Sequence, residues 1–134
     1  AFVVARQLLK SSYEKAYKND LAAIRADSTD PSSYFSLSYH ALFVDQYPQA
    51  IAAAQKTLQL NPQFVKVETN LALGYLLNNR YDLALPVYKK WKGKKFEAAD
   101  QDLADAIFLK DIAELEDMGV KHPDFQKVKD LFSK

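Results

Sequence analysis

Apolar residues recur along this chain at the spacing of three and four positions that is typical of amphipathic helices. Two stripes near its end illustrate the pattern: Leu103, Ile107, Ile112 and Leu115 form one, and Phe125, Val128, Leu131 and Phe132 form the other. This periodicity, with Gly and Pro at helix boundaries, predicts an all-α protein. The expected helices span residues 2–11, 13–26, 32–45, 47–60, 64–78, 80–92, 101–118 and 124–133.

The chain also matches itself after a shift of 34 residues. Five sets of three residues fall into register: Tyr13, Tyr47 and Tyr81; Ala16, Ala50 and Ala84; Leu8, Leu42 and Leu76; Leu9, Phe43 and Leu77; and Val3, Leu37 and Leu71. The tyrosines lie where the second helix of each unit is expected to start. The alanines lie where that helix approaches the first, because small side chains let helix axes come within about 8–10 Å. The self-similarity predicts repeated two-helix units.

The second and third units resemble the tetratricopeptide repeat, whose signature is Trp-x2-Leu-Gly-x2-Tyr, then Ala-x3-Phe, then Pro. The second unit has Tyr34-x2-Leu37-Ser38-x2-Ala41, Ala50-x3-Ala54 and Pro62, and the third has Glu68-x2-Leu71-Ala72-x2-Tyr75 and Ala84-x3-Tyr88. Asn61-Pro62 is similar to the turn between repeats, and Asn78-Asn79-Arg80-Tyr81 to the turn inside one. The chain departs from the signature at Glu68, Ala54 and Phe96, which replace an aromatic residue, a large ring and a proline.

The resemblance covers about residues 1–92 and implies a right-handed superhelix of antiparallel helix pairs, a tetratricopeptide-like α–α solenoid. Residues 1–98 are expected to form about three hairpins, and residues 99–134 to form helices that cap the last apolar face. The phase of the repeat puts Ala1 inside a helix. We therefore expect a first hairpin shortened at its start, or a parent chain that continues upstream. The tail resembles those that follow such repeats in multidomain bacterial proteins.

In the family that the chain resembles, the first helix of each hairpin lines a concave binding groove. The matching positions of the second and third units are candidate partner-binding residues: Phe35, Tyr39, Phe43, Lys66, Thr69, Asn70, Leu73 and Leu77. The first unit would add Ala5 and Leu9. This surface is mainly apolar and aromatic, which fits a partner's amphipathic helix better than a carboxylate clamp. Two alternatives stay open: these aromatic residues belong to the core, or the protein's own tail fills the groove.

Composition narrows the classes of partner. The 134 residues carry a formal net charge of +1, so no global field attracts nucleic acid or an acidic membrane surface. The absence of cysteine excludes disulfides, thiolate metal sites and cysteine nucleophiles. No apolar run approaches the roughly 20 residues that cross a bilayer. We expect a soluble protein, and the sequence does not decide between cytoplasm and periplasm.

The sequence offers little catalytic chemistry. Lysines surround Trp91 at positions 89, 90, 92, 94 and 95; they indicate either a patch for an acidic partner or, the favoured interpretation, a cationic helix end. His40 and His122 are the only histidines, and no metal-ligand spacing accompanies them. Phosphate-binding loops, nucleophile elbows and the H-E-x-x-H pattern do not occur. We therefore expect no catalytic residue, no metal and no cofactor.

The sequence thus predicts a non-enzymatic scaffold that binds a peptide or amphipathic helix of a partner protein on its concave face. The alternative is a structural or assembly module, in which the open first-repeat end packs on another copy or on neighbouring domains of a longer protein. Nothing in the sequence indicates that the chain forms a homo-oligomer, and nucleic acid is not an expected partner.

Overall fold

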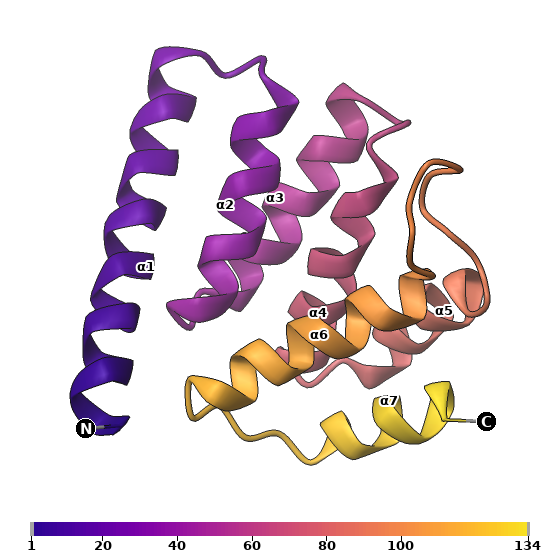
Figure 1. Cartoon of the computed structure of the whole chain (residues 1–134). Helices are drawn as coiled ribbons and strands as arrows, with labels where there is room; N and C mark the ends of the chain where they lie inside the picture. The colour runs from indigo at the N-terminus through magenta and orange to yellow at the C-terminus, as the bar shows by residue number, and fades with distance from the viewer. Residues whose placement is uncertain (1, 134) are drawn as a thin grey trace.

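The computed structural model describes residues 2–133, with side chains from Val4 onward, and contains seven α-helices and no strand within that range. The helices are α1 (Phe2–Ala26), α2 (Pro31–Phe43), α3 (Tyr47–Leu60), α4 (Glu68–Leu77), α5 (Tyr81–Trp91), α6 (Ala104–Asp117) and α7 (Asp124–Phe132), with a 3-10 turn, η1 (Val65–Val67), before α4. Successive helices from α1 to α5 pack side by side, and α6 crosses them (Figure 1). The all-α prediction is confirmed for this range. Ala1 and the side chain of Val3 lie outside the described residues.

The turn between the two helices of a unit recurs at the 34-residue interval in the second and third units. The second helices, α3 and α5, begin at the paired tyrosines of the repeat, Tyr47 and Tyr81. The turn before each tyrosine has a left-handed residue with a φ of 61°, which is Asp45 in one unit and Asn79 in the other. Each turn is closed by the same backbone hydrogen bond, Gln46 N to Ala41 O at 3.0 Å and Arg80 N to Tyr75 O at 2.8 Å.

The first unit does not form this turn. The expected break between helices 2–11 and 13–26 is wrong, because α1 runs without interruption from Phe2 to Ala26. Ser11 occupies the place of Asp45 and Asn79 in the repeat. Asp and Asn are the non-glycine residues that adopt left-handed backbone most readily, whereas serine has no such preference. The chain therefore continues as helix through Ser11.

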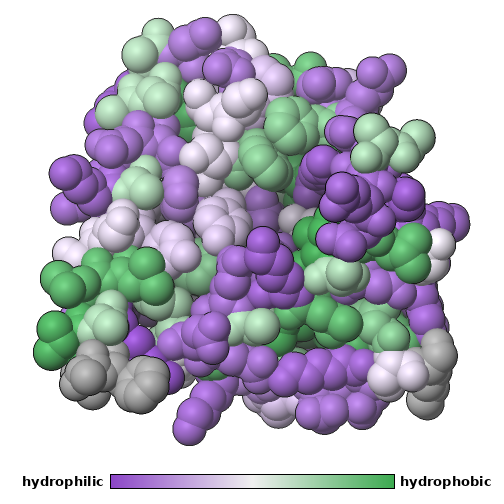
Figure 2. Space-filling view, viewed as in Figure 1, coloured by the Kyte–Doolittle hydropathy of each residue, from purple (hydrophilic) through white to green (hydrophobic). Residues whose placement is uncertain are grey.

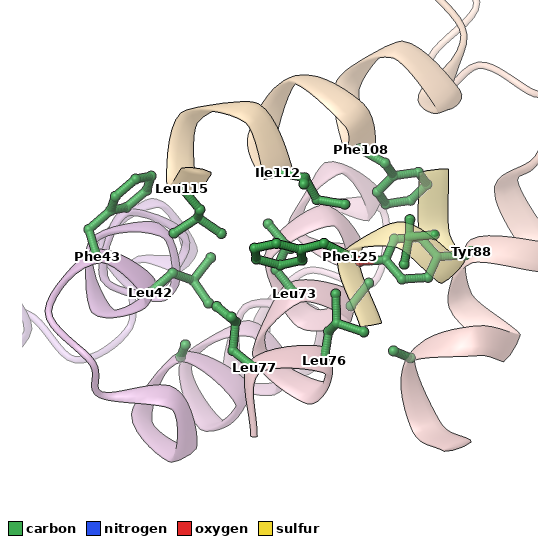
Figure 3. Close-up of a cluster of buried hydrophobic side chains, with 14 of the residues drawn as sticks. Leu42, Phe43, Leu73, Leu76, Leu77, Tyr88, Phe108, Ile112, Leu115 and Phe125 are labelled. Atoms are coloured by element: carbon green, nitrogen blue, oxygen red, sulfur yellow. The ribbon is translucent and has the colours of Figure 1, made fainter. Parts of the chain in front are cut away.

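The second-helix alanines allow close packing of the core. Ala50, Ala84 and Leu76 are fully buried, and Leu42 is 1% exposed. The tail adds to this core: Leu115 of α6 lies beside Leu42 and Phe43, and Ile112 and Phe108 lie near Leu73 and Tyr88 (Figure 3). Helix α7 contributes the buried Phe125 and Val128. One apolar core thus joins the repeated helices to the tail.

Glu68 explains one departure from the repeat signature. Glu68 is a residue of α4 that is 8% exposed. Its carboxylate accepts hydrogen bonds from the Trp91 indole at 2.8 Å and from Lys90 Nζ at 3.0 Å. An aromatic ring and a charged partner therefore come from α5, which compensates for the missing aromatic residue in α4. One lysine of the cluster around Trp91, Lys90, is thus paired with a carboxylate of the same chain.

Candidate functional site

A pocket of about 440 Å³ opens between α2, α4, α6 and the segment 92–103. This volume lies in the range of sites that hold a small molecule or a large side chain. Its lining residues come from these four segments and from η1: Phe35, Ser36, Tyr39, His40, Lys66, Thr69, Asn70, Phe96, Ile107 and Asp111.

The predicted concave-face residues divide into two groups. Five of them line the pocket: Phe35, Tyr39, Lys66, Thr69 and Asn70. The other three belong to the core, where Phe43 and Leu77 are 5% exposed and Leu73 is 2% exposed. Helix α6 lies over Phe43 and Leu73 (Figure 3), so in this arrangement no partner reaches them. The tail occupies one end of the predicted groove and leaves the other end open.

The pocket floor on α4 is held by internal hydrogen bonds. The Asn70 amide donates to Ser38 Oγ at 2.9 Å, and that serine donates to the Phe35 carbonyl at 2.6 Å. Thr69 Oγ1 donates to the Lys66 carbonyl at 3.0 Å. Asn70 is 1% exposed, so its amide is already committed to the protein. These bonds make the floor rigid, and few of its polar groups remain for a ligand.

A histidine, a carboxylate and a serine meet at the α1–α2 side of the pocket. Asp20 contacts His40 Nδ1 at 2.6 Å through one oxygen and accepts the Ser36 hydroxyl at 2.7 Å through the other. In a catalytic triad the serine bonds to the ring nitrogen opposite the carboxylate. Here Ser36 lies 3.4 Å from the same Nδ1 that contacts Asp20. Because the serine hydroxyl donates to the carboxylate, this cluster is a structural link between α1 and α2 and not an activated nucleophile.

Lys66 is the only lysine or arginine in the described pocket lining, and its charge is largely neutralised. Its ammonium lies 3.0 Å from Asp100 and 3.8 Å from Glu97, both in the segment 92–103. The hydrogen bond between them raises the pKa of Lys66 and lowers the pKa of Asp100. This ion pair also connects the segment that carries Phe96 to η1, the 3-10 turn before α4.

Helix α6 supplies the remaining polar groups. Tyr39 donates its hydroxyl to Glu114 at 2.9 Å, and burial with this hydrogen bond raises the pKa of the tyrosine. The Asp111 carboxylate lines the pocket and receives no hydrogen bond or ion pair from any residue that the structure describes. Burial, with a smaller effect of the neighbouring Glu114, raises its pKa to about 7. Asp111 is thus a partly buried acid that is paired with none of the residues that the structure describes.

Within residues 2–133 no group of three His, Asp or Glu side chains is placed to hold a metal ion. None of the described helices combines the length and the apolar character that crossing a bilayer requires. The pocket has apolar walls and few polar groups, which is the usual composition of a ligand site.

Sequence reasoning missed five pocket residues: Ser36, His40, Phe96, Ile107 and Asp111. Ser36 and His40 are four positions apart on one helical face, a spacing that brings side chains together. That spacing was a detectable signal. The tail residues had none, because their positions depend on how α6 crosses the repeated helices.

Comparison with known proteins identifies no relative: no family model, no curated protein and no solved structure matches this chain.

Proposed function

We propose that this chain is a tetratricopeptide-type module that binds a segment of a partner protein in the pocket between α2, α4 and α6. The observation that carries the proposal is that five of the eight candidate positions line one open pocket. The 34-residue recurrence of turns and helix starts supports the repeat assignment. Because α6 lies over the other end of the groove, the proposed ligand is a short segment with one anchoring side chain and not a long amphipathic helix.

The test is selection of random peptides displayed on phage against the whole chain, followed by binding measurements on the selected peptides. Ile107→Arg places a long charged side chain at the pocket wall and should weaken the selected peptides at least about tenfold. Leu103→Arg is the matched control, because Leu103 is 41% exposed and does not line the pocket. Circular dichroism and unfolding midpoints verify that both variants are folded. Equal binding to Ile107→Arg and to the unmodified chain would exclude this site.

We propose self-association as a second function, on the evidence of the apolar patch on α1, defined by Val4, Leu8 and Leu9. These side chains are 57%, 69% and 46% exposed, and Figure 2 shows hydrophobic surface over the N-terminal half of α1. The repeat equivalents of Leu8 are the buried Leu42 and Leu76. Residues at these positions of the repeat pack on a neighbouring helix in the other two units. In a dimer, the same patch on α1 of a second copy could take the place of that helix.

Sedimentation equilibrium over a wide concentration range tests this second function. Association that disappears in Leu8→Ser with Leu9→Ser supports it. Leu83→Ser is the matched control, because Leu83 is an exposed leucine on α5 (39%), outside the patch. A chain that stays monomeric at every concentration, or a double variant that still associates, refutes it.

A further inference from the structure

We propose that the pocket accepts a cationic side chain, the ammonium of a lysine or the guanidinium of an arginine on the partner segment. The cation would lie beside Asp111, and its aliphatic stem would lie between the apolar walls. This inference rests on the proposed function, because it names the chemistry of the anchor that enters the same pocket.

The charge around the pocket is mainly negative, although Lys110, which does not line the pocket, acts on Asp111 from the next position of α6. Its single lysine, Lys66, already has two carboxylate partners, Asp100 and Glu97. His40 is paired with Asp20, and Glu114 accepts the hydroxyl of Tyr39. Asp111 remains without any protein donor among the described residues. An entering cation would therefore meet an excess of negative charge, and it would find one carboxylate to which no described residue donates a hydrogen bond.

Burial makes the unused carboxylate a strong recognition element. An ionised acid that lacks donors in a partly apolar site is costly, which is the reason that the pKa of Asp111 rises to about 7. A bound ammonium or guanidinium would supply the missing donors and the opposite charge. Charge-assisted hydrogen bonds of this kind are roughly twice as strong as neutral ones.

The walls suit the stem of a long basic side chain. Phe35, Phe96 and Ile107 line the pocket and present apolar atoms to it. Phe35 is packed against Phe64 with ring centroids 4.8 Å apart, and Phe96 against Trp91 at 4.5 Å, so both rings are held in place. Lysine and arginine place a chain of methylenes on apolar surface while their charged end reaches a polar group. Aromatic faces also attract cations directly.

Other ligand chemistries fit less well. An anion would be repelled by the surrounding carboxylates, and the one ammonium at the site is already neutralised. A neutral apolar group would fill the walls but would leave Asp111 buried more deeply and still without donors, which increases its desolvation cost. A bare metal ion lacks ligands, since the described residues contain no suitable group of three.

The test uses small probes that share one carbon chain: n-butylammonium, n-butylguanidinium, n-butanol and butyrate. Each is titrated into the whole chain at about pH 8, above the pKa of Asp111, and followed by NMR shifts of backbone amides. The two cations should bind at the pocket at least about tenfold more tightly than butanol, and butyrate should not bind. Asp111→Asn should remove the preference for cations, so that the two cations bind this variant no more tightly than butanol does. Asp102→Asn is the matched control, because Asp102 is exposed, lies outside the pocket lining and makes the same change in charge.

The outcomes separate this inference from the proposed function. If butanol shifts the pocket amides and the cations have no advantage, the cationic anchor is wrong and the pocket remains a binding site. The same conclusion follows if Asp111→Asn keeps the full preference for cations. If no probe shifts amides that line the pocket, and the selected peptides bind Ile107→Arg normally, the proposed site fails together with the inference.

Discussion

Helix α1 and the two helical pairs that follow it share one residue pattern but follow different paths. In the pairs α2–α3 and α4–α5, the chain turns back at Asp45 and Asn79, each with a φ of 61°. In α1 the equivalent Ser11 is helical, and the chain runs straight. As a result Leu8 is 69% exposed, whereas its equivalent Leu76 is fully buried. The repeated apolar positions therefore determine which face of a helix is hydrophobic. The turn residue determines whether the chain folds back and buries that face.

The α1–α2 interface and the α3–α4 interface, on the two sides of the α2–α3 pair, show a second contrast. Between α1 and α2, Asp20 joins His40 and Ser36 through polar contacts. At the equivalent positions between α3 and α4 stand Ala54, Gly74 and Asn70. There the backbones approach closely: a Cβ added to Gly74 would lie 2.9 Å from the Cγ1 of Ile51. At these positions the α1–α2 interface has polar contacts and the α3–α4 interface has close backbone packing, although Tyr13 of α1 also stacks on Phe43 of α2 with ring centroids 4.1 Å apart.

The largest effect is expected from truncating equivalent leucines. Leu76→Ala removes a fully buried side chain and should lower the free energy of unfolding by about 2–5 kcal/mol, from lost burial and the cavity left behind. Leu8→Ala removes a mostly exposed side chain and should change it by less than about 0.5 kcal/mol. Urea denaturation of both variants measures the difference.

The difference between these two variants tests whether the first half of α1 is exposed in solution. Equal losses in the two variants would mean that Leu8 is buried in solution, either in a closed first hairpin or against a second copy. The concentration dependence of the unfolding midpoint separates these two cases, because only association makes stability depend on protein concentration.

A smaller effect is expected at the polar link of α1. Asp20→Ala leaves the Ser36 hydroxyl and the His40 ring without their shared acceptor, so unfolding free energy should fall by about 1–3 kcal/mol. Glu14→Ala is the matched control, because Glu14 is an exposed carboxylate of the same helix. Indistinguishable stabilities for the two variants would contradict the view that polar contacts hold α1 on α2.

The sequence predicted the all-α class and most of the helices, because helical periodicity and the 34-residue register both reflect local packing requirements. It failed at residues 10–12, where the apolar pattern of a hairpin is present but no residue favours a left-handed turn. For the site, the family resemblance predicted Phe35, Tyr39, Lys66, Thr69 and Asn70, which line the pocket, because it assigns the groove to the first helix of each hairpin. It did not identify Asp111 or the burial of Leu73, because both follow from the path of α6. That path is set by long-range packing, which no repeat encodes.

The smallest predicted effect tests the turn residue itself. Asn79→Ala should cost about 1–2 kcal/mol, because a Cβ without a compensating polar group disfavours left-handed backbone. Ser11→Ala should instead stabilise the chain by a few tenths of a kcal/mol, about the difference in helix propensity between the two residues.

Asn79 also contacts His122 Nε2 at 2.8 Å through its side chain, so the loss in Asn79→Ala has two contributions. Asn79→Gly separates them, because glycine adopts the left-handed conformation freely but makes no contact with His122. Stability near that of the unmodified chain in Asn79→Gly, as measured by urea denaturation, assigns the loss to backbone conformation. A glycine variant as unstable as the alanine variant would assign the loss to the His122 contact, and the missing turn in α1 would then need a cause other than Ser11.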